Sequence, residues 1–401
     1  MKRALIVSLF IFLFLIPLCY STPINTSAAT DYKLTIYTYQ SLLNEPVSFD
    51  LVGAFSNHSG IPKEEIQLLR LDDSNQILSR AILEKDNPTA DVLIGLDNIL
   101  VFKSKSENIL KSYNSPVLSN ISSSLIENLD PDHYLLPYDY GVIALWVDTN
   151  RLNVSTVPEL DSLTLNDILD LDLDKKMVVE NPIFSSPGLG FLLWTIAVLG
   201  DSSLDISGLL ESDWRDWWEE ANKDLRIASS WSEAFDIWYS EEADRPIMIS
   251  YGTSPAYSAC LYDDYSAVAY LTHENSSDNS WLQIEGLGLV NGAPNEENAK
   301  IFIDWFLSKE LQDQIATHNW MYPANKYAEV PECFTNSAIN PDTVDILNNL
   351  IPLEILENNL DFWLDEWEEI FAGEIPYSGL VITFSALFVT AFIYLRKKKK
   401  Q

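Results

Sequence analysis

Residues 246–257 have the sequence PIMISYGTSPAY, an apolar run followed at once by hydroxyl, aromatic, Gly and Pro residues. The apolar part leads into Tyr251 and is typical of a buried strand, and the residues after it are typical of a turn. A strand that opens into such a turn presents hydroxyls and backbone N–H groups at one place, here beside Tyr251 and Tyr257. The stretch therefore predicts a strand that delivers a ligand-binding loop. Taken alone, it fits a surface turn with core tyrosines equally well.

Short apolar runs alternate with helical patterns along the rest of the chain. The expected strands are residues 33–39, 90–95, 141–148, 177–180 and 247–251, and the expected helices are residues 64–71, 75–83, 189–199, 231–239 and 297–307. This alternation predicts α/β layers with largely parallel sheets, in which ligands bind at the carboxyl ends of strands. Three such ends carry polar or aromatic residues, at 37–39, 95–98 and 251–254.

The chain is large enough for two lobes. It has 401 residues, of which 47% are hydrophobic, and this is more than one compact core accommodates. Tryptophans recur at helical spacing in two segments, Trp214 with Trp217 and Trp218, and Trp363 with Trp367. We interpret both groups as core packing.

The N-terminus has the pattern of a secretory signal peptide, residues 1–21. Lys2 and Arg3 precede an apolar run that ends at Leu18, and small polar residues follow. Cys19 is not expected to carry a lipid, because Leu18 stands where a lipid-attachment site needs a small residue.

The C-terminus has the pattern of a membrane anchor. Residues 377–395 are nineteen positions without a charge, close to the roughly 20 that span a bilayer. Five consecutive basic residues follow. We therefore expect a transmembrane helix over residues 376–395 and a basic cytoplasmic tail over residues 396–401. The protein is then a single-pass protein of the cell membrane whose main part lies outside the cell.

The part between these two ends is strongly acidic. Two basic residues lie in the leader and five in the tail, so 18 of the 25 basic residues face 59 acidic ones. This charge argues against nucleic acid or an anionic lipid surface as partner and suits a cationic ligand, although solubility or adaptation to salt also accounts for it. Cys260 and Cys333 remain after processing, and they either pair or stay free. Asn-x-Ser/Thr triplets typical of an extracellular glycoprotein occur at Asn25, Asn57, Asn120, Asn153 and Asn275.

Catalytic signatures are mostly absent. The four histidines lack metal-ligand spacing, and the turn after Tyr251 lacks the closing Gly of a nucleophile elbow, so neither a metal site nor a serine hydrolase is expected. Residues 185–190, SSPGLG, instead indicate a helix start whose hydroxyls and free N–H groups either bind an anion or hydroxyl or simply cap the helix. Asp73 and Ser74 stand at a second helix start of this kind, which likewise either binds an anion or hydroxyl or is simply capped.

Seven blocks in a fixed order resemble the thiamine-binding proteins of ABC importers. They are YTYQS at 37–41, ADVLIGLDN at 90–98, PYDYG at 137–141, SSPGLG at 185–190 with LLW at 192–194, WSEAF at 231–235, SYGTSPAY at 250–257 and NWMYP at 319–323. The resemblance implies a two-lobed, periplasmic-binding-protein-like (type II) α/β fold with crossing hinge strands. It places lobe 1 at residues 31–141 and 262–372, and lobe 2 at residues 142–261.

The resemblance also implies roles for eight residues. The aromatic residues that enclose the thiamine rings are Tyr39, Trp231, Tyr251 and Trp320, and the residues that bind the hydroxyethyl or phosphate end are Ser185, Tyr257, Asp73 and Ser74. Two departures from the family pattern bear on the ligand. Residues 42–46 lack the Trp that members often carry after the first block, and the Gly usual beside Asp73 is replaced. The choice between thiamine, its phosphates and another cation therefore stays open.

The resemblance implies a membrane-anchored extracellular solute-binding protein that delivers thiamine or thiamine phosphate to an ABC permease, with no catalytic residue, metal or cofactor. The thiazolium is a permanent cation, and an aromatic face attracts a cation by about 0.5 to 2 kcal/mol, so four rings provide about 2 to 8 kcal/mol. Micromolar binding needs about 8 kcal/mol, so hydrogen bonds and exclusion of water by lobe closure must also contribute. The alternatives are a receptor for another cation such as a polyamine or ferric iron, an extracellular hydrolase that uses an acid pair, and a structural surface protein with a degenerate cleft.

Overall fold

The computed structural model describes residues 32–44, 47–152, 160–171, 177–210, 212–240 and 245–372. A continuous sheet runs through this part of the chain in the order β2-β1-β3-β12-β5-β8-β6-β7. The strands of this order are β1 (Leu34–Tyr39), β2 (Ile66–Leu71), β3 (Val92–Asp97), β5 (Leu136–Asp148), β6 (Met177–Glu180), β7 (Leu225–Ala228), β8 (Ile247–Tyr251) and β12 (Leu282–Val290). Three more strands pair with β12 or β5: β4 (Leu110–Lys111), β9 (Ala267–Tyr270) and β13 (Tyr322–Pro323). A separate small sheet consists of β10 (Thr272–Glu274), β11 (Ser277–Ser280) and β14 (Asp345–Ile346).

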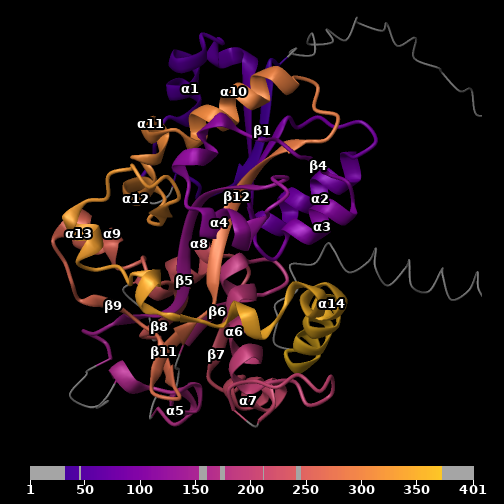
Figure 1. The fold of residues 1–401 in the computed structure, drawn as a ribbon. Coiled ribbons are helices and arrows are strands. Elements are labelled where there is room, and N and C mark those ends of the chain that lie inside the picture. The colour runs from indigo at the N-terminus through magenta and orange to yellow at the C-terminus, as the bar shows by residue number, and fades with distance from the viewer. Residues whose placement is uncertain are drawn as a thin grey trace, which may run out of the picture.

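Helices pack around both halves of the long sheet (Figure 1). The helices that precede β6 are α1 (Leu51–Ser59), α2 (Ser74–Glu84), α3 (Val101–Ser106), α4 (Ser123–Leu129) and α5 (Leu165–Leu169). Those between β6 and β9 are α6 (Ser186–Leu199), α7 (Trp214–Ala221), α8 (Trp231–Tyr239) and α9 (Ala256–Tyr262). The last group is α10 (Glu296–Leu307), α11 (Lys309–Gln312), α12 (Ile315–His318), α13 (Glu332–Thr335) and α14 (Leu353–Ile370).

Two strands connect the halves of the sheet. β5 pairs with β12 over Leu136–Val142 and with β8 over Ile143–Val147, so its 13 residues belong to both halves. β12 pairs with β3 on its other side. In Figure 1 both strands run between an upper lobe, which holds β1 and α10, and a lower lobe, which holds β6, β7 and α7. The predicted two-lobed α/β fold with crossing strands is confirmed.

Each lobe has its own hydrophobic core. The upper cluster of buried residues includes Ile36, Leu93 and Phe302, and the lower cluster includes Leu193 and Trp367. Helix α14 therefore packs in the lower lobe, although the expected boundaries place all of residues 262–372 in lobe 1. The physical reason is its apolar face, whose Trp367 ring meets Trp218 of α7 edge to face at 5.8 Å.

An ion pair fixes α14 to α7. Arg215 donates to Asp201 Oδ1 at 3.0 Å and to Glu366 Oε2 at 2.9 Å, and Trp363 Nε1 donates to Asp201 Oδ2 at 2.8 Å. Burial alone would raise the pKa of Asp201, but the hydrogen bonds from Arg215, Ser203 and Trp363 hold it well below its usual value. The interpretation of both tryptophan groups as core packing is confirmed.

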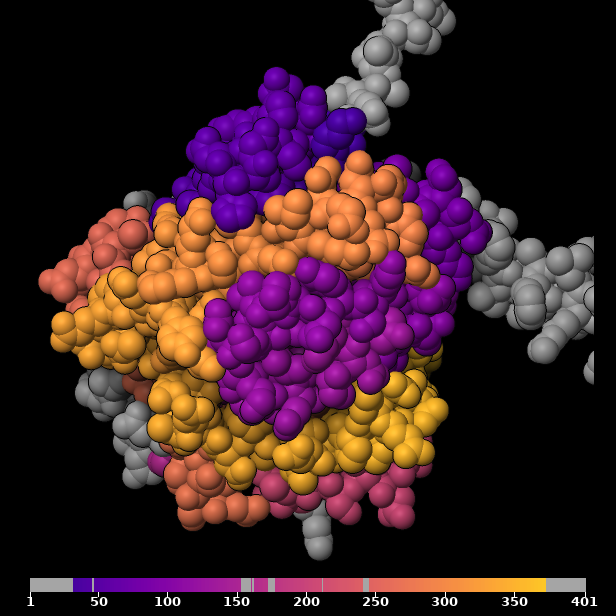
Figure 2. All heavy atoms as spheres, turned by 45° about the horizontal axis from the view of Figure 1, so that its top comes forward, coloured from indigo at the N-terminus to yellow at the C-terminus, as the bar shows by residue number. Residues whose placement is uncertain are grey.

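Segments far apart in sequence form one surface of the upper lobe. Figure 2 shows the chain around α4 (purple) lying against the chain around α10 (orange). Tyr113 and Ser115, which precede α4, both donate hydrogen bonds to Asp304 of α10, at distances from 2.6 to 3.1 Å. These bonds fix α10 to the segment that precedes α4.

Residues 64–71 were expected to form a helix, and this prediction is wrong. They form a short 3-10 turn, η1 (Lys63–Glu65), and then β2, which pairs in parallel with β1 from Leu34↔Ile66 to Tyr39↔Leu71. Pairing along the whole of β1 outweighs the local helical pattern. Strand β12 was not among the expected strands, because Gly286 and Gly288 interrupt its apolar run. A Cβ at Gly286 would lie 2.4 Å from Leu135 Cγ, so close packing requires glycine there.

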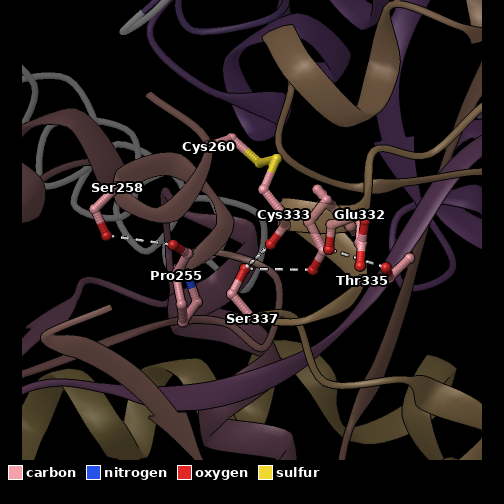
Figure 3. The surroundings of a disulfide bond; sticks show 8 residues. Pro255, Ser258, Cys260, Glu332, Cys333, Thr335 and Ser337 are labelled. Carbon is pink, nitrogen blue, oxygen red and sulfur yellow. Dashed lines mark hydrogen bonds between the residues drawn. A yellow bond between two sulfur atoms is a disulfide. The ribbon is translucent and has the colours of Figure 1, made fainter. Parts of the chain in front are cut away.

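Cys260 of α9 and Cys333 of α13 form a disulfide with Cα atoms 5.1 Å apart (Figure 3). The sequence left this pairing open. Next to the bond, Ser337 Oγ donates to Cys333 O at 2.7 Å. Cys260 also packs against a small cluster of buried residues that includes Tyr257 and Trp320, so the disulfide lies close to the interior of the cleft region.

The predicted signal peptide (residues 1–21), transmembrane helix (376–395) and basic tail (396–401) lie outside the described residues. Within those residues, no helix is both long and apolar enough to cross a membrane. Of the glycosylation positions, Asn57 and Asn275 are exposed and Asn120 is half-buried, whereas Asn25 and Asn153 lie outside the described residues.

Candidate ligand-binding site

A cleft lies between the lobes, where the carboxyl ends of β1 and β8 meet the first turns of α2 and α6. The space between its walls is about 740 Å³, solvent at the mouth included. The lining contains seven of the eight predicted residues: Tyr39, Asp73, Ser74, Ser185, Trp231, Tyr251 and Trp320. The other lining residues are Ser41, Asp72, Ser186, Pro187, Ser232, Ser254, Glu285, Asn319 and Met321.

Tyr39 ends β1 with its ring over Gly95 of β3. A Cβ at Gly95 would lie 2.3 Å from Tyr39 Cδ1, and Gly95 has a φ of 102°, so both the space and the backbone require glycine. The Tyr39 hydroxyl donates to Glu285 Oε2 at 2.8 Å and accepts from Asn319 Nδ2 at 3.2 Å. The ring is therefore held in place by the protein itself, which lowers the entropic cost of binding.

Trp231 begins α8 and stacks on Phe235, with ring centroids 5.3 Å apart and planes 11° apart. Phe235 stacks in the same way on Tyr239 at 5.2 Å, so three rings run along α8. Trp231 lines the cleft, whereas Tyr239 is 54% exposed to solvent. Trp231 Nε1 donates to Ser250 Oγ at 2.9 Å, which fixes the indole plane. The arrangement presents an aromatic wall to the cleft.

Trp320 follows α12 with a φ of 56°, a backbone conformation that bulky residues rarely adopt. It is 6% exposed, and within the described part of the chain its Nε1 is buried without a hydrogen-bond partner. Strained backbone and an unpaired buried donor persist only where the surroundings enforce them, and they are frequent at ligand sites. The structure thus places Trp320 in the cleft wall, as predicted.

Tyr257 does not line the cleft, although a direct contact with the ligand was expected. Its ring meets the Trp320 ring edge to face at 5.4 Å, and its hydroxyl lies 3.4 Å from that of Tyr262. The reason is that α9 begins at Ala256, directly after the turn that follows β8, and this helix turns Tyr257 into a small buried cluster with Phe334. Tyr257 therefore packs against Trp320, which lines the cleft, and does not line the cleft itself.

The first turns of α2 and α6 form a polar end of the cleft. Asp73 is the N-cap of α2 and accepts from Gln76 N at 3.0 Å, so the capping interpretation holds there. Ser185 is the N-cap residue of α6 but makes no capping hydrogen bond. Ser186 Oγ donates to Asp97 Oδ2 at 2.7 Å and lies 3.3 Å from Ser74 Oγ, which joins the two lobes across the cleft. Burial raises the pKa of Asp73 to about 6.

The floor of the cleft is acidic. Glu285 of β12 lies directly opposite Asp139 of β5 in the antiparallel register. Glu285 Oε2 accepts from the hydroxyls of Tyr39 at 2.8 Å and Tyr138 at 2.6 Å. Asp139 Oδ2 accepts from Asn319 Nδ2 at 2.7 Å. Burial raises the pKa of Glu285 to about 7, and burial together with the charge of Glu285 raises that of Asp139.

A further hydrogen bond links this floor to Tyr251. Gln283 Nε2 donates to the Tyr251 hydroxyl at 2.8 Å and to Glu285 Oε1 at 3.1 Å. Burial, followed by the negative charges of Glu285 and Asp139, raises the pKa of Tyr251. Tyr251 is thus a neutral ring in a negative environment.

Sequence reasoning missed Glu285, Asn319 and Met321. The last two lie in the NWMYP block, so their neighbourhood was known but their side chains were not singled out. Glu285 is one acid among 59 in the chain and carries no local signal. Within the described part of the chain, no group of three or more His, Cys, Asp or Glu side chains is placed to hold a metal ion.

Comparisons with known proteins identify the family of the chain. A family model described as "Bacterial extracellular solute-binding protein" matches residues 87–349. The thiamine-binding periplasmic protein of Escherichia coli (strain K12) is 29% identical over 342 residues, which are 84% of this chain and 92% of that protein. The protein of the same name from Haemophilus influenzae is 23% identical over 87% of this chain and 96% of its own length. The resemblance inferred from the seven blocks is confirmed.

Solved structures show the same fold. A periplasmic thiamin binding protein superposes with a TM-score of 0.68 at 25% identity, over 84% of this chain and 95% of its own. A ferric binding protein from Campylobacter jejuni superposes with a TM-score of 0.62 at 15% identity, over 84% and 99% of the two chains. At that identity the second likeness concerns the fold alone.

Proposed function

Because the chain belongs to the bacterial extracellular solute-binding proteins, whose members bind solutes rather than catalyse reactions, we propose that it captures thiamine or a thiamine phosphate for transport. The observation that carries this proposal is the composition of the cleft. Four aromatic rings from different elements line the cleft together with Glu285: Tyr39 at the end of β1, Trp231 at the start of α8, Tyr251 at the end of β8 and Trp320 after α12. Flat rings and a carboxylate suit a flat, permanently cationic ring system.

Both ends of thiamine find suitable partners in this cleft. The aromatic walls provide stacking for the aminopyrimidine and the thiazolium, and the hydroxyls of Ser74 and Ser185 at the polar end suit the hydroxyethyl group. Asp72 and Asp73 lie at the same end, and their carboxylates favour a hydroxyl, which donates a hydrogen bond, over a phosphate, which repels them. We therefore place free thiamine ahead of thiamine phosphate.

Membrane anchoring and delivery to an ABC permease belong to the same proposal. The apolar run at residues 376–395 and the basic residues after it support a helix that tethers the binding domain to the outer face of the cell membrane. A tether of this kind keeps the receptor near its permease, which raises the local concentration of loaded protein.

A polyamine is the second candidate ligand, because a buried acidic floor between aromatic walls also suits an extended polyvalent cation. Calorimetric titration of the purified protein with thiamine, thiamine phosphate and spermidine, and with ferric iron, distinguishes the candidates. We expect thiamine to bind at micromolar or lower concentration. If spermidine binds and thiamine does not at tens of micromolar, the thiamine assignment is refuted.

A further inference from the structure

Two neighbouring carboxyl groups lie at the floor of the cleft: Glu285 lines the cleft, and Asp139 stands opposite it on the next strand. Asp139 and Glu285 are 0% and 5% exposed and lie opposite each other on the two crossing strands. The hydrogen bonds that the described residues donate to them come from the hydroxyls of Tyr39 and Tyr138 and from the amides of Gln283 and Asn319. All four donors are neutral. Two buried charges without a cation are costly, so the floor needs either a proton or a cationic ligand.

Among the described residues, the groups that face Glu285 from the surrounding elements include no cation either. The titratable groups that face it are Tyr39 from β1, Asp97 from β3, Asp139 and Tyr138 from β5, and Tyr251 from β8. Phenols are neutral at physiological pH, and the two carboxyls, Asp97 and Asp139, can only add negative charge. Each additional negative charge makes protonation of the pair more favourable.

Unpaired atoms around the floor indicate that the site is incomplete without a ligand. Within the described part of the chain, Asp139 Oδ1 and Gln283 Oε1 are buried without a hydrogen-bond donor, and Trp320 Nε1 is buried without an acceptor. Trp320 and Glu285 both line the cleft. The wall of the cleft therefore offers one unpaired donor, Trp320 Nε1, to whatever occupies the space beside Glu285.

We propose that Glu285, paired with Asp139, selects ligands that carry a positive charge and releases a shared proton when such a ligand binds. This inference rests on the proposed function and adds the rule by which the same cleft chooses its ligand. Before binding, the pair holds one proton and has a charge of minus one. On binding, the proton leaves to solvent, the pair has a charge of minus two, and the ligand contributes plus one, so the total charge in the cleft is unchanged.

The geometry allows this shared proton. Asp139 and Glu285 occupy directly opposite positions of the antiparallel pair, where Cβ atoms lie about 4.5 to 5.5 Å apart, so their carboxyl groups can approach each other. Because Glu285 titrates near neutral pH, with a pKa of about 7, the exchange falls in a range where binding can be measured. Coupled carboxyls titrate as a pair, so the proton belongs to both rather than to either residue.

Calorimetric titration of the purified full chain with thiamine tests the inference. At about pH 6.5, titrations in phosphate and in imidazole buffer should differ in apparent enthalpy by an amount that corresponds to the release of a substantial fraction of one proton. The dissociation constant should fall as pH rises, by up to about tenfold per unit below the pKa of Glu285, and level off above about pH 8. The uncharged oxidation product thiochrome should bind without proton release.

Two variants provide the comparison. Glu285→Gln keeps the shape of the side chain, and we expect it to bind thiamine at least about tenfold more weakly, without proton release and without pH dependence from about pH 6.5 to 8. Glu274→Gln is the matched control, because Glu274 is also a buried carboxyl, 2% exposed, but lies outside the cleft on β10. It should retain the proton release of the natural protein.

The possible results separate this inference from the proposed function. Tight thiamine binding with no proton release in the natural protein overturns the proton exchange and leaves the thiamine receptor intact. No thiamine binding between about pH 6.5 and 8.5, in a protein that unfolds cooperatively, overturns both. The comparison of two buffers uses the natural protein. It therefore tests the inference even if one of the variants fails to fold.

Discussion

Replacement of Trp231 by Ala is the most direct test of the aromatic wall. Trp231 lines the cleft with one face and stacks on Phe235 with the other. Loss of a desolvated cation contact removes up to about 2 kcal/mol. Loss of about 50 Å² of apolar contact removes about 1 kcal/mol more. We expect the binding free energy of thiamine to weaken by about 2 to 3 kcal/mol, which is about a 30- to 150-fold rise in the dissociation constant.

Tyr239→Ala is the matched control on the same helix. Tyr239 stacks on Phe235 at nearly the same distance, 5.2 Å, but is 54% exposed and does not line the cleft. Calorimetry with thiamine should give an affinity within about twofold of the natural protein for Tyr239→Ala. Equal weakening in both variants would mean that the stack along α8 matters for folding and that Trp231 does not contact the ligand. Trp320→Ala is a poorer probe, because Trp320 is 6% exposed and its removal should destabilise the fold by about 3 kcal/mol or more.

Four further outcomes are expected. Replacement of both Cys260 and Cys333 by Ser opens a loop with a sequence separation of 73. By the chain-entropy relation, this lowers the free energy of unfolding by about 4 kcal/mol, which chemical denaturation measures. A change under about 1 kcal/mol contradicts this estimate. Arg215→Met leaves Asp201 buried without its cation and should cost about 3 kcal/mol at neutral pH. Since the folded-state pKa of Asp201 is depressed, its contribution is present above about pH 4 and is lost below it, so the deficit of Arg215→Met in urea denaturation should shrink on acidification. Ser186→Ala removes the hydrogen bond between the lobes at Asp97. In calorimetry, the binding free energies of thiamine and of thiamine phosphate should both weaken by about 1 kcal/mol. Unequal losses mean that Ser186 contacts the ligand directly. The preference for thiamine over thiamine phosphate should grow as pH rises through about 6, where Asp73 becomes charged; a preference that does not change with pH excludes Asp73 from the polar end.

Local pattern predicted some elements of the fold and missed others. The strands at 177–180 and 247–251 and the helix at 231–239 were predicted to the residue, because each has uninterrupted periodicity and clear boundaries. The prediction of a helix at residues 64–71 was wrong because their strand conformation depends on pairing with β1, more than 25 residues earlier in the chain. Strand β12 was not predicted because Gly286 and Gly288, which close packing requires, interrupt its apolar run.

The residues of the candidate site also divide into those that could be predicted from the sequence and those that could not. Tyr39, Trp231, Tyr251 and Trp320 could be predicted, since they stand in blocks whose order resembles a known family, and all four line the cleft. Tyr257 stands in such a block too, but the direction of its side chain depends on where α9 begins, which the block does not reveal. Position along the chain identified the segments of the site, and only packing decided which side chains face the ligand.

The acidic floor shows why part of a binding site is out of reach of any local pattern. Asp139 and Glu285 are separated by nearly the whole of the lower lobe in sequence, and only the antiparallel register of β5 and β12 brings them together. The aromatic walls accept any flat or apolar group, because stacking and area burial are permissive. A buried carboxyl pair is not permissive, since an uncharged ligand leaves it to hold a proton while a cation replaces that proton. Selectivity in this cleft should therefore reside in the crossing strands, which belong to both lobes, and affinity in the rings that each lobe contributes separately.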